Sequence, residues 1–534
     1  MRIVSTTEMK ELERLADEKF GFSEKLIIEN AGTSGANCVE QWFGRKSFSH
    51  EIVFLVGKGN NGSDGMAIAR NLVNKGYKCR AFVFFAEADC KKDLLEQINM
   101  AKSFGVFVNF VDEVYQLSSY LDEVGADCIV DCLFGTGVQL PLSNFMYDLI
   151  EYINNFGKPI IALDIPSGVS GDTGEIQGNA INADLTLVIG FPKLGHYIAH
   201  GPRQSGTIKV LDVGFPRAFS LEGDKFLLRP DYMVDLVNPR DKFADKKVYG
   251  HSLVLGGSHG LTGAPALAAQ ASLRVGSGLV TVATWESQYQ ELLQRLIPEL
   301  MTGYIPLDTN KWSRLLVDLN KYSSVVIGPG LARSTRARRL VLEILNNFDG
   351  PVILDADAIN VLNFKEDKDA FTLRNAPTVL TPHFGEFAKF SGVEYSELEK
   401  APVRYLKNLV DQIGCTVVLK GPCTYLGCTD GSVYFNYRPN DGMATAGAGD
   451  VLAGILGGLL GQDLKVKEGG ASLLQRYNAL NRTVAFSIYL HSLCGQIAAS
   501  DYGVRAMGAQ SLITSLPKAF KNLDDQFDKI YQEK

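Results

Sequence analysis

The sequence predicts two α/β domains, each built on a largely parallel sheet covered by helices. Three observations support this fold class. Short, almost continuously apolar segments alternate with helical segments along the chain, as in parallel sheets that are buried on both faces. The alternation lapses over residues 212–245, where charged residues are frequent. The length of 534 residues also exceeds that of one ordinary domain.

The first half begins with a helix, in which Ser5 and Glu8 form a capping box and which Gly21 ends. Five strands follow, at residues 51–57, 79–85, 126–132, 159–166 and 183–190. The helices expected between them include residues 66–74 and 94–104. This order predicts a Rossmann-like doubly wound sheet, which binds ligands beyond the carboxyl ends of its strands.

The second half restarts the strand and helix alternation and ends in a long helical tail from about residue 471. Its strands are expected at residues 251–258, 278–284, 323–330, 351–360, 378–382 and 416–422. We therefore place one domain at 1–215, a linker at 216–227 and a second domain at 228–534. The polar stretch 461–482 is longer than this fold requires, and we interpret it as a surface insertion.

Composition and charge narrow the class of protein. The chain is 46% hydrophobic and 21% charged with a net charge of −7, which argues against nucleic acid or an anionic membrane as its partner. Its nine cysteines contain no CxxC pair, so neither a zinc site nor a disulfide framework is indicated. The N-terminus lacks the apolar core of a signal peptide, and the longest apolar run, 451–461, is too short to cross a bilayer. We expect a cytoplasmic protein that forms a homo-oligomer.

Polar side chains follow three strands of the first half. After the first strand, KGNNGSDG opens into a helix expected at Met66, a position suited to binding phosphate. The spacing matches neither GxGxxG nor a P-loop, so neither nucleotide fingerprint applies. Asp131 lies in VDCLFGTG, and Asp164 and Ser167 lie in ALDIPSG. Their amide, carboxylate and hydroxyl oxygens suit a hard cation, and a second carboxylate can act as acid or base.

The second half contains an anion-binding motif, GMATAGAGDVLAG, at 442–454. Small residues let backbone N–H groups close around an anion at the start of a helix, and Asp450 stands at its mouth. Other strands end in IGPGL, LDADAIN, TPHFGE and LKGPCT. His383 in TPHFGE is either a ligand or merely hydrogen-bonded. Taken alone, the motif favours a kinase.

The motifs NNGSDG, DCLFGTG, LDIPSG and FPKLGH, in this order, resemble those of the NAD(P)H-hydrate epimerase family over residues 1–215. The resemblance implies that Asn61, Asp131 and Ser167 bind K⁺, and that Asp164 contacts the damaged nicotinamide ring. Asp164 is our candidate for the catalytic proton carrier, and Lys193 is a weaker one. Ser63 stands where the family usually has glycine. The implied substrate-binding residues are Asn60, Asn61, Gly62, Ser63, Asp64, Gly135, Thr136, Gly137, Val138, Gln139, Leu140, Pro141 and Asp164.

The motifs of the second half resemble the ribokinase-like superfamily and, within it, NAD(P)H-hydrate dehydratase over about 228–520. The resemblance implies a ribokinase-like fold, and a catalytic role for Asp450. The family often shows Gly-Gly-Thr-Gly-Asp where this chain has AGAGD, so one hydroxyl contact to phosphate is missing. The residues implied to contact the hydrate are Ala264, Gly330, His383 and Asp450. Those implied to contact ADP, with ATP as the alternative and Mg²⁺ alongside, are Lys420, Gly421, Pro422, Cys423, Thr424 and Gly449.

Together the two resemblances imply a bifunctional enzyme that repairs NADH-hydrate and NADPH-hydrate. The first domain would interconvert the R and S hydrates, and the second would dehydrate the S form at the expense of ADP. Two alternatives remain open at this point. One is a small-molecule kinase, acting for example on a vitamin precursor, with an accessory N-terminal domain. The other is a binding scaffold in the first domain, against which the retained polar residues and the net charge argue.

Overall fold

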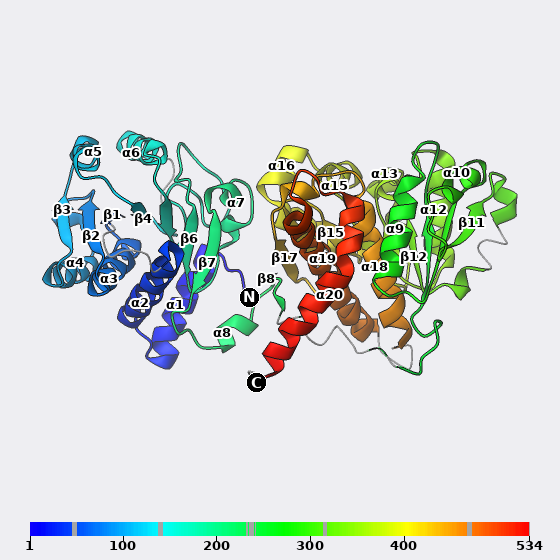
Figure 1. The fold of residues 1–534 in the computed structure, drawn as a ribbon, viewed down its shortest axis with the longest axis horizontal. Coiled ribbons are helices and arrows are strands. Elements are labelled where there is room, and N and C mark those ends of the chain that lie inside the picture. The colour runs from blue at the N-terminus through cyan, green and yellow to red at the C-terminus, as the bar shows by residue number, and fades with distance from the viewer. Residues whose placement is uncertain are drawn as a thin grey trace. The chain divides into compact units, whose positions relative to one another are not determined.

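A computed structural model describes residues 1–44, 51–136, 142–230, 233, 240, 242–312, 318–466 and 473–532. The chain forms two compact units, Met1–Gly223 and Asp224–Lys534 (Figure 1). The boundary between them lies inside the segment 216–227, where the sequence predicts a linker. This segment contains helix α8 (Ala218–Leu221) before the boundary and strand β8 (Lys225–Leu227) after it.

The sheet of the first unit has seven parallel strands in the order β3-β2-β1-β4-β5-β6-β7. The sheet grows in opposite directions from β1 and β4, so the predicted doubly wound topology is confirmed. All five predicted strands are present. The edge strands β3 and β7 were missed, because many of their residues are exposed or half-buried and neither has a continuously apolar sequence. The strands are β1 (Glu51–Val56), β2 (Lys78–Val83), β3 (Phe107–Phe110), β4 (Cys128–Cys132), β5 (Ile160–Leu163), β6 (Leu185–Ile189) and β7 (Thr207–Leu211).

The helices of the first unit confirm the predicted N-terminal capping box. Ser5 Oγ accepts a hydrogen bond from Glu8 N–H at 3.1 Å, and Gly21 ends the helix in the left-handed conformation with φ 63°. The helices are α1 (Thr6–Phe20), α2 (Glu24–Phe43), α3 (Asn60–Asn74), η1 (Glu87–Asp89), α4 (Lys92–Ser103), α5 (Val114–Glu123), α6 (Asn144–Asn155), η2 (Leu194–His196), α7 (Gly201–Gln204) and α8.

The start of α3 corrects one prediction. The helix begins at Asn60, six residues before the expected Met66, so NNGSDG forms its first turns and not a glycine loop. The glycines here serve close packing. A Cβ at Gly62 would lie 2.3 Å from the Gly57 carbonyl oxygen, and one at Gly65 would lie 2.4 Å from Cys132 Sγ. The amide and carboxylate of this motif are therefore fixed on a helix.

The sheet of the second unit has ten strands in the order β11-β10-β9-β12-β13-β14-β15-β16-β17-β8. Strands β15, β16 and β17 pair antiparallel, and the other pairs are parallel. The six predicted strands are present, and β8, β11, β16 and β17 were missed. The further strands are β9 (His251–Leu255), β10 (Leu279–Trp285), β11 (Met301–Ile305), β12 (Ser324–Ile327), β13 (Val352–Leu354), β14 (Thr378–Leu380), β15 (Thr416–Leu419), β16 (Cys423–Gly427) and β17 (Val433–Tyr437).

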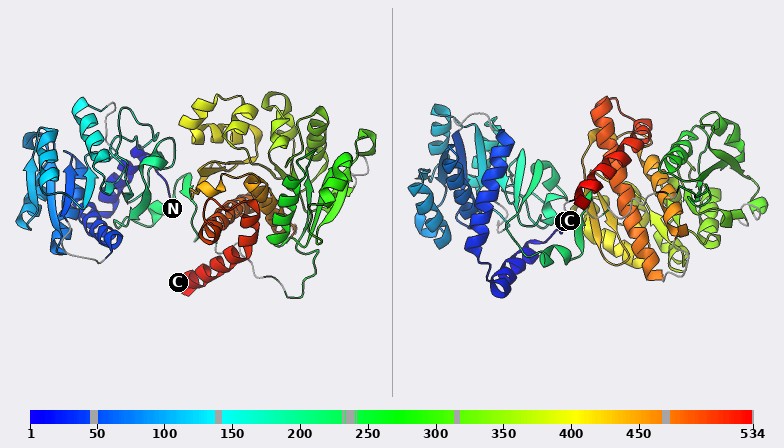
Figure 2. Two further views of the ribbon diagram at one scale, coloured as in Figure 1. Left: turned by 45° about the horizontal axis from the view of Figure 1, so that its top comes forward. Right: turned by 60° about the horizontal axis from the view of Figure 1, so that its bottom comes forward.

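Helices α18, α19 and α20 pack with α9 against the sheet of the second unit, and Figure 2 shows the yellow helices α15 and α16 across the sheet from them. The predicted tail is two helices, α19 and α20, separated at Gly503 with φ 78°. The longer helices are α9 (Gly263–Arg274), α12 (Thr335–Asn347), α14 (Phe364–Thr372), α15 (Phe384–Ser391), α17 (Pro402–Ile413), α18 (Ala448–Val466), α19 (Leu473–Tyr502) and α20 (Ala509–Gln532). The short ones are η5 (Glu286–Gln288), α10 (Tyr289–Leu293), η6 (Thr309–Lys311), η7 (Asp318–Lys321), α13 (Asp357–Asn360), α16 (Tyr395–Lys400) and η8 (Asp441–Met443).

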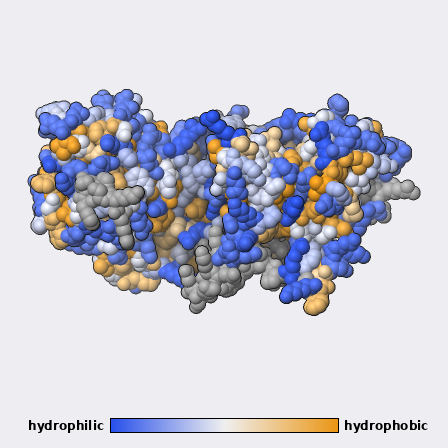
Figure 3. All heavy atoms as spheres, in the orientation of Figure 1, coloured by the Kyte–Doolittle hydropathy of each residue, from blue (hydrophilic) through white to orange (hydrophobic). Residues whose placement is uncertain are grey.

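Two further predictions concern membrane-spanning segments and the stretch 461–482. Within those residues, no helix is both long enough and apolar enough to span a membrane, and Figure 3 shows hydrophilic side chains over much of the face in view. The stretch 461–482, expected to be a surface insertion, includes the end of α18 and the start of α19. Its residues 467–472 lie outside the described part of the chain.

Candidate active sites

Asp131 and Ser167 form the buried base of a polar cluster beyond β4 and β5 of the first unit. Ser167 donates to both carboxylate oxygens of Asp131, from Oγ at 2.7 Å and from its backbone N–H at 2.8 Å. Leu133 N–H donates a third hydrogen bond at 3.2 Å. Burial raises the pKa of Asp131 to about 6, although the hydrogen bonds from Ser167 and Leu133 oppose this rise. The network fixes both side chains in one geometry.

Asn61 joins this pair through the backbone of Phe134. Its Nδ2 donates to the Phe134 carbonyl at 2.9 Å, and Phe134 N–H donates to Ser167 Oγ at 3.0 Å. Asn61 Oδ1 is buried without a hydrogen-bond partner among the described residues. A buried oxygen of this kind normally has a partner, so it indicates a ligand. The three residues predicted to bind K⁺ are thus gathered in one place.

The oxygen atoms of Asn61, Asp131 and Ser167 are suited to a monovalent cation such as K⁺. Across the described ranges, no cluster of three or more His, Cys, Asp or Glu side chains is placed to hold a metal ion. One carboxylate with amide, hydroxyl and backbone oxygens is instead the kind of donor set that hard cations prefer.

Asp164 follows β5 with its backbone in the left-handed region, at φ 65°, which is uncommon for a residue other than glycine. His196 holds this conformation. Lys193 N–H donates to His196 Nδ1 at 3.0 Å, so Nε2 carries the proton and donates to the Asp164 carbonyl at 2.8 Å. Burial lowers the pKa of His196, which agrees with a neutral ring.

The Asp164 carboxylate forms a buried ion pair with Lys193, whose Nζ also donates to the Ile189 carbonyl at 3.2 Å. A Cβ at Gly135 would lie 3.5 Å from Asn61 Cγ and 3.6 Å from Asp164 Oδ2, so Gly135 borders both side chains. Lys193, the weaker of the two predicted proton carriers, therefore lies in direct contact with the stronger one.

The remaining predicted residues of the first site fall into four groups. Ser63 Oγ and Asp64 Oδ1 are buried without partners in the described part of the chain. Asn60 bonds elsewhere, donating to Glu24 and accepting from Lys91 Nζ at 2.7 Å. Thr136 lies half-buried beyond Gly135. Gly137, Val138, Gln139, Leu140 and Pro141 lie outside the described residues.

Sequence analysis missed a fourth carboxyl group near this site, beside those of Asp64, Asp131 and Asp164. Glu13 lies on α1, whose preceding strand-like segment pairs with the FPKLGH loop through Val4 N–H and the Pro192 carbonyl at 2.9 Å. Burial raises the pKa of Glu13, Lys193 lowers it, and Asp164 raises it. The pKa of Asp64 is also raised well above its usual value. Burial is the largest cause, and the negative charges of Asp164 and Glu13 raise it as well. Nothing in the amphipathic sequence of α1 distinguishes Glu13 from a surface residue.

The second unit gathers polar groups where β13, β14 and β15 end. Asp355 is buried directly after β13, and its Oδ1 accepts from Lys420 Nζ and from Thr381 Oγ1, each at 2.7 Å. Ala356, the next residue, has φ 47° and ψ −115°. Asp355 was not predicted to be a site residue, although its motif LDADAIN was recognised as a strand end.

Asp450 lies in the first turn of α18. Its pKa is raised to about 7, chiefly by burial and then by the charge of Asp355, while the charge of Lys420 opposes this rise. A Cβ at Gly449 would lie 3.3 Å from Lys420 Nζ, so the ammonium group lies beside the GAGD loop. His491 Nε2 is 2.9 Å from the Ala448 carbonyl and anchors this turn to α19.

His383 is hydrogen-bonded, as one of its two interpretations predicted. Its Nδ1 accepts from the backbone N–H groups of Gly385 at 3.0 Å and Glu386 at 3.2 Å, so the ring caps α15. The side chain is 60% exposed, and its Nε2 lies 3.5 Å from Glu386 Oε1. The other two residues expected to contact the hydrate are adjacent, since a Cβ at Gly330 would lie 3.4 Å from Ala264 Cβ.

The segment expected to contact ADP is a turn between β15 and β16. Thr424 Oγ1 donates to the Gly421 carbonyl at 3.4 Å. Cys423 is buried within β16, and burial raises the pKa of its thiol. A contact from Cys423 to a nucleotide would therefore come from its backbone, as would a contact from Pro422 through its carbonyl.

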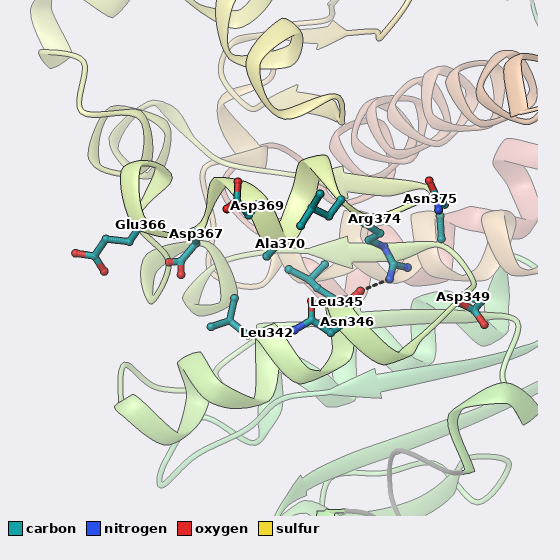
Figure 4. Close-up of a pocket in the computed structure, with 12 residues that line it drawn as sticks. Leu342, Leu345, Asn346, Asp349, Glu366, Asp367, Asp369, Ala370, Arg374 and Asn375 are labelled. Carbon is teal, nitrogen blue, oxygen red and sulfur yellow. Dashed lines mark hydrogen bonds between the residues drawn. The ribbon is translucent and has the colours of Figure 1, made fainter.

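A cavity of about 650 Å³ lies between α12 and α14 (Figure 4). Its lining includes Leu342, Leu345, Asp369 and Arg374, and it contains none of the predicted site residues. Arg374 Nη1 donates to the carbonyl of Leu345 at 2.5 Å, which ties the two helices together. The cavity is thus separate from the strand-end cluster.

Comparison with known proteins gives two family matches in one chain. Residues 24–195 match the model described as YjeF-related protein N-terminus. Residues 252–518 match the model described as NAD(P)H-hydrate dehydratase. The two matches cover the first and the second polar cluster, respectively.

Relatives match over nearly the whole chain. The bifunctional NAD(P)H-hydrate repair enzyme Nnr of Moorella thermoacetica is 33% identical, over 99% of this chain and 98% of its own length. The protein of the same name from Thermofilum pendens is 32% identical, over 100% and 98%. Among solved structures, the Bacillus subtilis ADP/ATP-dependent NAD(P)H-hydrate dehydratase co-crystallised with ATP/Mg²⁺ is 27% identical, with a TM-score of 0.47, over 56% of this chain and 98% of that one.

Proposed function

The chain belongs to the family of bifunctional NAD(P)H-hydrate repair enzymes, and on this basis we propose how its two sites divide the work. The first unit interconverts the R and S hydrates of NADH and NADPH. The second dehydrates the S form to NAD(P)H at the expense of ADP. The observation that carries this proposal is that similarity to bifunctional relatives extends over 99% of the chain and so includes both polar clusters.

In the epimerisation, the hydroxyl at C6 leaves with a proton and water returns to the opposite face of the ring. The nitrogen next to C6 supplies the electrons that stabilise the cation formed in between. Asp164 is the group that exchanges the proton with the departing and returning water, and Lys193 keeps its carboxylate in place. The buried, unpartnered oxygens of Ser63 and Asp64 bind polar groups of the hydrate.

K⁺ at this site would be held by Asn61, Asp131 and Ser167. The buried Oδ1 of Asn61, which lacks a partner among the described residues, supports this proposal. A bound cation would supply positive charge near the substrate and connect the loops that follow β4 and β5. Replacing K⁺ with Li⁺ in the assay is therefore expected to lower epimerisation and leave dehydration unaffected.

In the dehydration, Asp450 removes the proton of the C6 hydroxyl of the bound S hydrate. ADP would transfer its terminal phosphoryl group to this oxygen, which breaks the bond between its two phosphates and releases AMP. Phosphate would then leave C6 with the electron pair of the C–O bond, and loss of the C5 proton would form the C5=C6 double bond of NAD(P)H. The N–H groups at the start of α18 and the Lys420 ammonium lie where they can bind the phosphate. Ala264, Gly330 and the exposed side chain of His383 bind the hydrate.

A small-molecule kinase with an accessory domain is the less favoured alternative. It explains the GAGD loop but gives no role to the buried Asn61, Asp131 and Asp164 cluster of the first unit.

The experiment is an absorbance assay at the reduced-nicotinamide band with separated R and S hydrates. We expect the S hydrate to yield NAD(P)H only with ADP or ATP present, and the R hydrate to yield it after a lag. Phosphorylation of an alcohol from ATP, with the S hydrate left unchanged, would instead support the kinase.

A further inference from the structure

Asp355 is a buried carboxylate that accepts hydrogen bonds from two side chains of the strand-end cluster. Its side chain is 2% exposed, and its Oδ1 accepts hydrogen bonds from both Lys420 Nζ and Thr381 Oγ1 at 2.7 Å. An ion pair this deeply buried costs desolvation, so it adds little to stability in general. Its retention points to a role in the geometry of the site.

The backbone next to Asp355 also adopts an unfavourable conformation. Ala356, at φ 47° and ψ −115°, lies in a region that residues with a side chain rarely adopt. Gly328 approaches so closely that a Cβ there would lie 1.8 Å from the Asp355 carbonyl oxygen. Strain of this kind is found where a structure holds a functional group in one position.

Lys420 links Asp355 to the catalytic loop. Its backbone N–H donates to the Pro382 carbonyl at 2.8 Å, and its Nζ lies beside Gly449. A lysine side chain is flexible and carries a compact charge, so without a fixed partner it would occupy several positions. The contact with Asp355 restricts the ammonium to the place where it faces both the GAGD loop and Asp450.

We propose that Asp355 is a positioning residue of the dehydration: by holding the Lys420 ammonium beside the GAGD loop, it sets the charge balance under which Asp450 accepts its proton. This inference rests on the proposed dehydratase function.

The other titratable groups around Asp450 do not replace this pair. Glu386 on α15 also attracts Lys420 and helps to keep it charged. His491 on α19 is buried, and burial lowers its pKa to about 4, so it is neutral at working pH. His383 accepts two backbone hydrogen bonds through Nδ1, which an imidazolium cannot do. Asp355 and Lys420 therefore dominate the electrostatics at Asp450.

The test is the pH profile of S-hydrate dehydration by the full chain at saturating ADP. Asp355→Asn removes a negative charge near Asp450, while the amide oxygen can still accept the hydrogen bond of Lys420 Nζ and keep the ammonium in place to stabilise the Asp450 carboxylate. We expect the midpoint of the rising limb of kcat to move down by about one pH unit. Lys420→Met removes the positive charge, and its midpoint is expected to move up.

Two matched controls separate positioning from folding. Thr381→Val loses one hydrogen bond to Asp355 without a change of charge, and Asp355→Glu keeps the charge; both are expected to retain the wild-type midpoint. Loss of activity at every pH with an unchanged midpoint in active Asp355→Asn protein would overturn the inference. If Asp355→Asn does not fold, an unchanged or lowered midpoint in Lys420→Met overturns it. Absence of ADP-dependent dehydration in the wild type would instead contradict the proposed function.

Discussion

Each candidate active site sets a carboxylate near a lysine, but the two pairs differ in one contact. In the first unit, Lys193 forms an ion pair with Asp164 directly. In the second unit, Lys420 forms its ion pair with Asp355, and its positive charge lowers the pKa of Asp450. The carboxylate proposed as catalytic is thus hydrogen-bonded to its lysine in the first site, whereas in the second site the lysine is bound to another carboxylate. This difference suits an Asp164 that exchanges a proton reversibly and an Asp450 that must accept one.

Asp164→Asn is expected to lower the rate of epimerisation at least about 100-fold, because the amide cannot exchange the proton. Asparagine tolerates the left-handed backbone at φ 65°, so the fold is expected to be kept. The measurement is the rate at which purified R hydrate yields S hydrate, separated by chromatography. Asp89→Asn, at an exposed carboxylate, is the matched control, and a wild-type rate in Asp164→Asn would exclude Asp164 as the proton carrier.

The pH dependence of dehydration follows from the raised pKa of Asp450, which is about 7. A base acts in its ionised form, so kcat is expected to rise from pH 6 to pH 8 with a midpoint near 7. Asp450→Asn is expected to lower kcat about 100-fold or more across this range. Stopped assays at fixed ADP measure both. A kcat that falls over the same range would mean that Asp450 acts as an acid.

At the scale of elements, helix α18 positions the GAGD loop because it packs very closely on α9. A Cβ at Gly454 would lie 2.1 Å from the Ala268 carbonyl oxygen, and one at Gly458 would lie 2.7 Å from that of Ser272. Glycine is therefore required on this face, since the two backbones nearly touch. The N-terminal turn of α18 inherits its position from this contact.

Gly454→Ala is expected to destabilise the second unit by about 2 kcal/mol, because an added methyl group forces the two helices apart. Urea unfolding followed by circular dichroism measures the change. Gly263→Ala on α9 is the control, because no atom lies within 4 Å of its added Cβ. Equal stabilities of the two variants would contradict close packing between α9 and α18.

The elements that the sequence predicts correctly share one property: each is indicated by residues that lie close together in the chain. The central strands are continuously apolar, and the capping box of Ser5 and Glu8 is a short motif. Strand β16, which begins at Cys423 within the segment expected to contact ADP, was missed because its pairing partner β17 is not apparent locally. The start of α3 was misplaced because its glycines, which usually indicate a loop, here allow contact with β1 and β4.

The residues of the candidate sites also divide into those indicated by local motifs and those indicated only by contacts between distant parts of the chain. Asp131, Asp164 and Asp450 stand at strand or helix ends in polar motifs, so their positions alone indicated chemistry. Glu13 and Asp355 depend on contacts over long separations in the chain. The Asp355–Lys420 pair joins residues 65 positions apart, and no spacing rule predicts such a partner.

At the scale of the whole molecule, each compact unit contains a complete set of the residues proposed for its own reaction. Stereochemistry explains why one chain carries both. Dehydration of the S hydrate alone would leave the R hydrate of any mixture unrepaired. The epimerase converts the remaining R hydrate to the S hydrate, which the dehydratase then converts to NAD(P)H. The two reactions therefore form a sequence.

This arrangement predicts that the two sites can complement each other in trans. With an equal mixture of R and S hydrates, Asp164→Asn is expected to convert about half of the substrate rapidly, since only slow spontaneous inversion supplies more S form. Asp450→Asn is expected to convert almost none. Mixing the two variants restores complete conversion, because the S hydrate made by one full chain diffuses to the other. The absorbance at the reduced-nicotinamide band follows all three reactions. If the mixture still stops at half, the R hydrate must be processed within one intact chain, and the two sites are not independent.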